Sequence, residues 1–128
     1  MTRRIERVNS LLVEVIAEVV MREVKDPRLP GLITITRVET SPDLRQAKVY
    51  FSLLGDDKQK KLALDLLQDA AGFIAVTASK KVVLRFFPQL TFKIDDTMEK
   101  HQRIDDLLKK IDDEKHARSR NNQDDSTN

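Results

Sequence analysis

The chain has 128 residues, no cysteine, 34% charged side chains and a net charge of +2. This length suits one domain with a modest core, and the missing cysteines exclude disulfides, thiolate catalysis and cysteine metal ligands. No apolar run approaches the ~20 residues of a membrane span, and the charged N-terminus has no apolar signal region, so we expect a soluble cytoplasmic protein with no membrane partner.

The charge is unevenly distributed along the chain. Residues 1–93 carry 16 Lys and Arg against 11 Asp and Glu, whereas residues 94–128 carry 7 against 10. A basic body followed by an acidic tail favours a polyanion as the partner of the body, although an ordinary mixed-charge surface would also account for a surplus of five.

The first predicted element is an amphipathic helix. Apolar residues from Ile5 to Val24 recur at spacings of three and four, and acidic and basic residues occupy the other face. The pattern predicts a helix of roughly 20 residues that ends at Asp26-Pro27, because a residue before proline avoids helical geometry.

Two strands are predicted next, at Leu32–Val38 and Gln46–Leu54. Both alternate apolar and polar residues, and the alternation slips near Arg37, which suggests a bulge. Ser41-Pro42-Asp43 suits a turn, so the two strands form a predicted antiparallel hairpin.

A second helix follows Gly55 and runs into the small residues Ala70-Ala71-Gly72, after which a short basic helix is predicted at about Val76–Lys81. A glycine inside a helical pattern costs about 1 kcal/mol relative to alanine. We therefore expect Gly72 to allow a bend between the helices or a close backbone approach.

The last predicted strand, Val83–Ile94, places Leu84 and Phe86 on the apolar face and Arg85 and Phe87 on the other. Pro88 cannot donate to a neighbouring strand, which indicates an edge position, and the helical crossover favours parallel pairing with the second strand. The predicted fold is α+β, a three-stranded mixed sheet covered by helices on one face. The open face would carry Lys48, Tyr50, Arg85, Phe87 and Lys93.

Residues 97–113 predict one more amphipathic helix, whose apolar stripe would pack on the domain or on a partner. Residues 114–128 are polar, without bulky apolar side chains, and are expected to be disordered. The predicted division is a domain at 1–96, a helix at 97–113 and a tail at 114–128.

Signs of catalysis are few. Three glycines cannot build a phosphate-cradling loop, and both histidines, His101 and His116, fall in the C-terminal region. Asp56-Asp57 and Asp95-Asp96 could hold Mg²⁺ as in a metal-dependent nuclease, but adjacent aspartates at element ends are more often helix-dipole partners. We expect no catalytic residue, no metal site, no cofactor and no small-molecule substrate.

Basic residues instead indicate RNA binding, since phosphate contacts need cations spread along a track. The candidates come from the start of the first helix, the turn that follows this helix, the hairpin, the second helix pair and the last strand. They are Arg3, Arg4, Arg7, Arg28, Arg45, Lys48, Tyr50, Lys80, Lys81 and Arg85.

Five blocks of the sequence together resemble the ribosome-binding factor A family in order and spacing. They are VKDPRL at 24–29, VETSPDL at 38–44, AKVY at 47–50, AAGFI at 70–74 and LRFFPQLTF at 84–92 with Asp95, within about residues 3–110. The resemblance implies a type II KH-like domain with the order α-β-β-α-kink-α-β, in which Ala70-Ala71-Gly72 forms the kink.

The resemblance also implies a function. A member of this family would be a non-enzymatic monomer that binds the free 30S ribosomal subunit and its rRNA. It would aid late maturation and 5′-end processing of 16S rRNA, with a link to growth in the cold.

Ala75-Val76 stand where the family usually has an arginine and a small polar residue, which removes one expected RNA contact. The family's usual glycine is also missing from residues 98–104. Two alternatives remain open: a general KH-like RNA-binding regulator, and a small metal-dependent ribonuclease.

Overall fold

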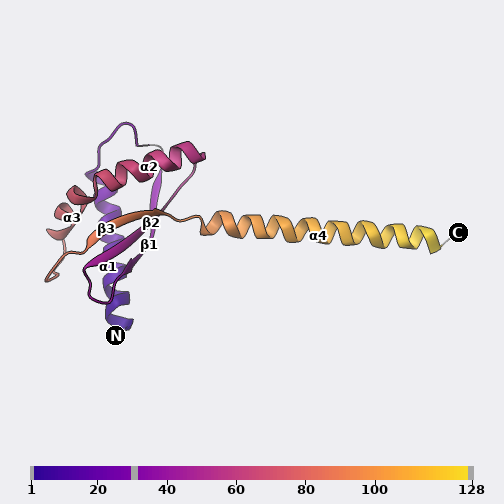
Figure 1. The fold of residues 1–128 in the computed structure, drawn as a ribbon, viewed down its shortest axis with the longest axis horizontal. Helices are drawn as coiled ribbons and strands as arrows, with labels where there is room; N and C mark the ends of the chain where they lie inside the picture. Colours follow the sequence, from indigo (N-terminus) through magenta and orange to yellow (C-terminus); the bar gives the residue numbers. More distant parts are fainter. Residues whose placement is uncertain (1, 30–31, 127–128) are drawn as a thin grey trace. The chain divides into compact units, whose positions relative to one another are not determined.

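The computed structural model describes residues 2–29 and 32–126 (Figure 1). The chain divides into two compact units, Met1–Asp95 and Asp96–Asn128. The first unit contains α1, β1, β2, α2, α3 and β3, in the order that the sequence predicts, and the second is the single helix α4.

Helix α1 spans Thr2–Arg22. Its apolar residues at three- and four-residue spacing form one buried face, which consists of Leu12, Val15, Ile16, Val19 and Val20. The helix ends before the predicted break at Asp26-Pro27, and Asp26 instead organises a turn whose backbone carbonyl accepts from Leu29 N at 3.0 Å.

The three strands form one mixed sheet in the order β1-β2-β3. Strands β1 (Ile33–Thr40) and β2 (Gln46–Leu53) are antiparallel, and β3 (Gln89–Ile94) pairs in parallel with β2. The register shifts between Ile35 and Arg37, which confirms the predicted bulge. β3 is an edge strand, also as predicted.

The predicted start of the last strand at Val83 is wrong. Strand pairing begins only at Gln89, directly after the buried Pro88. Alternation cannot be extended back through residues 83–88, because proline removes a donor and this segment is irregular. As a result Phe87 packs against the core, whereas Phe86, predicted to face inward, is 67% exposed.

Helices α2 (Asp57–Asp69) and α3 (Ala71–Ser79) meet at a bend of 55°. Asp56 caps α2 in a capping box: its carboxylate accepts from Gln59 N at 2.8 Å, and Gln59 Oε1 accepts from Asp56 N at 3.0 Å. Helix α3 begins five residues earlier than predicted, at the bend itself.

The predicted bend is confirmed, and it lies within the predicted segment Ala70-Ala71-Gly72. The bend lies at Ala70, and a Cβ atom added to Gly72 would meet nothing within 4 Å. The expectation of a close backbone approach within the chain is therefore wrong, and Gly72 is exposed.

The core lies between the sheet and the three helices. Strand side chains alternate, so that Val38, Val49, Phe51, Leu90 and Phe92 are buried while Lys48, Thr91 and Lys93 are exposed. Helices therefore cover one face of the sheet, as predicted. Phe51 is the largest fully buried side chain, and its truncation to alanine would cost roughly 3–5 kcal/mol.

Helix α4 spans Thr97–Ser126, so it continues beyond Asp113, where the sequence predicts its end. Residues 114–126 lack bulky apolar side chains, but they also lack glycine and proline, so nothing in them interrupts a helix. Pairs one turn apart, such as Lys100 with Asp96 at 3.4 Å and His116 with Asp112 at 3.6 Å, lie along its surface. Its apolar stripe is 42–59% exposed, at Ile104, Leu107, Leu108 and Ile111.

Candidate nucleic-acid interface

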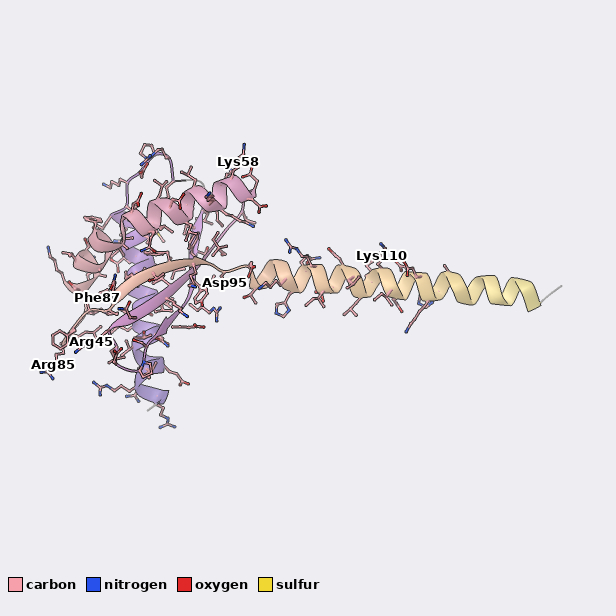
Figure 2. All side chains as sticks on the ribbon, in the orientation of Figure 1. Arg45, Lys58, Arg85, Phe87, Asp95 and Lys110 are labelled. Atoms are coloured by element: carbon pink, nitrogen blue, oxygen red, sulfur yellow. The ribbon has the colours of Figure 1, made fainter. Side chains whose placement is uncertain are left out.

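Three of the predicted RNA-binding arginines converge on one hollow of the first unit. Arg4 comes from α1, Arg45 from the β1–β2 turn, and Arg85 from the segment between α3 and β3. Figure 2 shows Arg45 and Arg85 at the same end of this unit. We call this hollow of about 300 Å³ the arginine pocket; its other lining residues are Val8, Asp43, Leu44, Leu84, Phe86 and Pro88.

The β1–β2 turn fixes one wall of the pocket. Leu44 adopts a positive φ of 61°, and its N–H donates to Ser41 O at 2.9 Å. Asp43 Oδ1 accepts from Ser41 Oγ at 2.6 Å and from Arg45 N at 3.1 Å. These hydrogen bonds, the Ser41 hydroxyl first, lower the pKa of Asp43 and keep it ionised.

The turn is also tied to the sheet, because Gln89 N donates to Arg45 O at 2.8 Å. This bond joins the start of β3 to the turn before β2. The backbone of Arg45 is thus held from two sides, so the exposed side chain starts from a fixed point on the rim.

The start of α1 carries a surplus of cations. Arg3, Arg4 and Arg7 are exposed, and the first turn contains no acidic residue. Cations are unfavourable at a helix N-terminus, where the helix dipole is positive. Only Arg4 lines the arginine pocket; Arg3 and Arg7 line a shallow depression beside Glu6 and Ser10.

Tyr50 and Lys48 lie on the open face of the sheet as predicted, but one side of the Tyr50 ring is covered. The Arg37 guanidinium lies 3.9 Å from the ring centroid and pairs with Glu39 at 2.7 Å. A base could therefore stack only on the other side of this ring. Arg37, which the sequence indicates only as the position of a bulge, covers this side of the ring.

The remaining candidates differ in how far they are already paired. Arg28 pairs with Asp26 at 2.8 Å, a contact that raises the pKa of Arg28 and lowers that of Asp26. Lys81 pairs with Glu18 of α1 at 3.4 Å. Lys80 is exposed and makes no ion pair with any residue that the structure describes.

Arg85 does not lie on the open face of the sheet, where the sequence analysis placed it. It precedes β3 and stands on the rim of the arginine pocket, with its guanidinium 5.4 Å from the Phe86 ring centroid. Phe86 is the pocket's exposed aromatic residue, although the alternation of residues 83–94 predicts it in the core.

A second surface surrounds the bend between α2 and α3. Gly72, Phe73 and Val76 are exposed there, and Phe73 and Val76 are 53% and 58% accessible. A separate hollow on this side is lined by Ala70, Phe73 and residues 23–28, and it shares no residue with the arginine pocket.

The aspartates considered for Mg²⁺ have other partners. Asp56 caps α2, and Asp95 Oδ2 accepts from Thr36 Oγ1 at 2.6 Å and lies 3.9 Å from Arg37 Nε. Within residues 2–29 and 32–126 no three His, Asp or Glu side chains are placed to hold a metal ion.

In the described part of the chain, no helix is by itself long and apolar enough to span a membrane. Helices α2 and α3 reach the required length and composition only as a pair, across their 55° bend.

Comparison with known proteins gives one consistent result. The sequence profile of the family described as ribosome-binding factor A matches residues 4–108. A protein of that name from Protochlamydia amoebophila is 51% identical over 122 residues, covering 95% of this chain and 93% of that protein. One from Halothermothrix orenii is 40% identical over 115 residues, covering 90% and 93%.

Solved structures agree with the sequence comparison. The crystal structure of ribosome-binding factor A from Thermus thermophilus matches with a TM-score of 0.60 at 26% identity, covering 70% of this chain and 94% of that one. A homology model of the Thermus protein, as fitted into the cryo-electron-microscopy map of a complex of the 30S subunit with ribosome-binding factor A, matches with a TM-score of 0.58 at 26% identity, covering 69% and 91%.

Proposed function

Because the chain belongs to the ribosome-binding factor A family, we propose that it binds the small ribosomal subunit and acts in the assembly of that subunit. The observation that carries this proposal is the likeness to the Thermus protein, whose fitted coordinates describe a complex with the 30S subunit. The match covers 91% of the Thermus protein, so nearly all of that protein has a counterpart in this chain.

The surface of the first unit supports an RNA partner. Arg3, Arg4 and Arg7 are exposed at the start of α1, and Arg4 lines the arginine pocket together with Arg45 and Arg85. A surface of this kind attracts phosphates and releases their counterions on binding. We propose that it contacts rRNA. Arg28, Lys48, Tyr50, Lys80 and Lys81 stay predictions, and of these Arg28 and Lys81 would first have to leave an ion pair.

A second proposed contact is the bend. Glycine costs a helix stability, and Gly72 has no steric need for its missing side chain within the chain. A glycine at this exposed position is explained if an rRNA backbone approaches α3 so closely that a side chain would be in the way.

The proposed biological role follows the family resemblance of the sequence. The protein would act without catalysis in the cytoplasm, as a monomer, during late maturation of 16S rRNA. Its action would include 5′-end processing and would matter most for growth in the cold.

Binding measurements with the purified full chain test the proposal. We expect tighter binding to isolated 30S subunits than to an unrelated RNA as long as 16S rRNA. We also expect that neither 16S rRNA nor the unrelated RNA is cleaved in the presence of Mg²⁺. Equal affinity for both RNAs would instead favour a general RNA-binding regulator. Mg²⁺-dependent cleavage lost in Asp96→Asn would favour a ribonuclease.

A further inference from the structure

We propose that the arginine pocket holds one unpaired nucleotide of RNA, with its phosphate on the arginines and its base against Phe86. This inference rests on the proposed function and adds a ligand to it. The pocket shares no lining residue with the hollow beside the bend, so the nucleotide would be bound apart from the contact at Gly72.

The charges of the pocket call for an anion. Arg4, Arg45 and Arg85 line one hollow, and none of them forms an ion pair within residues 2–29 and 32–126. Asp43 is the single carboxylate in the lining, and it is kept ionised by Ser41 Oγ and Arg45 N, so three cations face one anion and a surplus of positive charge remains. A bound phosphate would relieve the repulsion among the three guanidinium groups and match their planar donors.

The apolar lining calls for more than a phosphate. Val8, Leu44, Leu84, Phe86 and Pro88 complete the walls, and the Phe86 side chain is 67% exposed. Bases stack readily on exposed aromatic rings, and arginine guanidinium planes offer a second stacking surface. A nucleotide satisfies both the cations and this apolar wall, whereas an inorganic anion would leave the wall unused.

The size of the pocket limits the ligand. About 300 Å³ is at the lower end of the range of small-molecule sites, which suits one nucleotide. A base paired within a duplex cannot reach such a hollow without leaving its stack. The pocket would therefore take a base from a loop, a bulge or a single-stranded end.

The backbone of the pocket is strained where a ligand would bind. Leu44 has a φ of 61°, a conformation that a leucine rarely adopts, and its side chain lines the hollow. The Ser41–Leu44 hydrogen bond and the Asp43 contacts hold it there. Such outliers concentrate at ligand-binding sites, because surrounding contacts must maintain them.

Phe86→Ala tests the proposal, because it removes the stacking surface without changing the charge. Affinity would be measured over a salt series for a single-stranded RNA, a duplex RNA and free AMP. We expect Phe86→Ala to weaken single-strand binding about tenfold at every salt concentration, with the salt slope and duplex binding unchanged. Arg85→Ala should instead reduce the log–log salt slope for the single strand by roughly 0.7.

Two matched variants serve as controls. Val83→Ala truncates a fully exposed apolar residue three positions away that does not line the pocket. Lys58→Ala removes a cation from the start of α2, away from the pocket (Figure 2). Both should bind like the wild type.

Three outcomes would overturn the proposal. The first is that Phe86→Ala binds single-stranded RNA as tightly as the wild type does. The second is that Phe86→Ala loses as much affinity for duplex RNA as for single-stranded RNA. The third is that the wild type binds AMP as tightly as RNA, which would assign the pocket to a free nucleotide. Pelleting of the wild-type protein with 30S subunits tests the proposed function separately. A protein that pellets with subunits but fails the Phe86 test retains that function and loses only this inference.

Discussion

Gly72→Ala should make the protein more stable. Gly72 lies in the first turn of α3, its φ is outside the left-handed region, and an added Cβ would meet open space. Alanine there reduces the conformational freedom of the unfolded chain and favours the helix, without a steric cost in the folded state.

The magnitude follows from the position. An interior helical glycine costs about 0.5–1 kcal/mol relative to alanine, and Gly72 is only the second residue of α3, so we expect a gain no larger than this. For a domain of this size, each kcal/mol shifts the melting temperature by roughly 4–8 °C. Urea denaturation should show a higher midpoint with an unchanged m-value, since the surface exposed on unfolding is nearly the same.

Gly55→Ala is the matched control, because there a Cβ would collide with Gln59 Oε1, the atom that accepts from Asp56 N in the capping box. Displacing that side chain weakens the cap and offsets the gain from alanine, so no rise in stability is expected. The reasoning would be refuted if Gly72→Ala were no more stable than the wild type, or if Gly55→Ala were stabilised equally. Binding of Gly72→Ala to 30S subunits should fall, and unchanged binding would remove the proposed rRNA approach at this residue.

Three further predictions concern charge and domain structure. Joint alanine substitution of Lys80 and Lys81 should lower the salt slope of RNA binding by roughly 0.7 per lost contact. It should reduce the free energy of unfolding by less than about 1 kcal/mol, because only the half-exposed Lys81–Glu18 pair is lost; a wild-type slope would exclude both lysines from the interface. Truncation after Asp96 should leave the melting temperature nearly unchanged in circular dichroism, since no core residue follows that point, and a large fall would show that the C-terminal helix supports the domain. Asp43→Ala should be less stable than the wild type at pH 7, and this difference should shrink in acid denaturation as the pH falls below 3.8 through the lowered pKa of Asp43; a difference independent of pH would contradict the cited cause.

Much of the fold could be predicted because side-chain periodicity reports burial. The spacing of apolar residues from Ile5 to Val24 identified α1, and the slipped alternation near Arg37 identified the bulge in β1. The parallel pairing of β3 followed from the long helical connection before it.

Periodicity failed where the chain is irregular. The alternation from Gln89 to Ile94 does not continue back through Pro88. Extending it there predicts a buried Phe86 and an exposed Phe87, whereas Phe86 is exposed and Phe87 packs against the core. Gly72 was interpreted as the cause of the bend, although the bend lies two residues earlier, at Ala70. A glycine in a helix indicates that another group approaches the backbone closely. The sequence does not say whether that group belongs to the chain itself or to a binding partner.

The candidate site was predicted only as separate cations. Arg4, Arg45 and Arg85 are distant in the sequence, and no local pattern indicates that a helix start, a hairpin turn and an irregular segment meet. Their meeting depends on long-range packing, of which the Gln89–Arg45 backbone hydrogen bond is one part. The pairing of Lys81 with Glu18 was equally beyond local reasoning, because it joins α1 to the end of α3.

Binding to the free small subunit is the central claim, and sedimentation of a cell extract on a sucrose gradient tests it most directly. The distribution of the protein would be followed by immunoblotting across free small subunits, large subunits, whole ribosomes and polysomes. We expect the protein to peak with free 30S subunits and their precursors. An equal or greater amount in polysomes, or a position at the top of the gradient with no ribosomal particle, would contradict it.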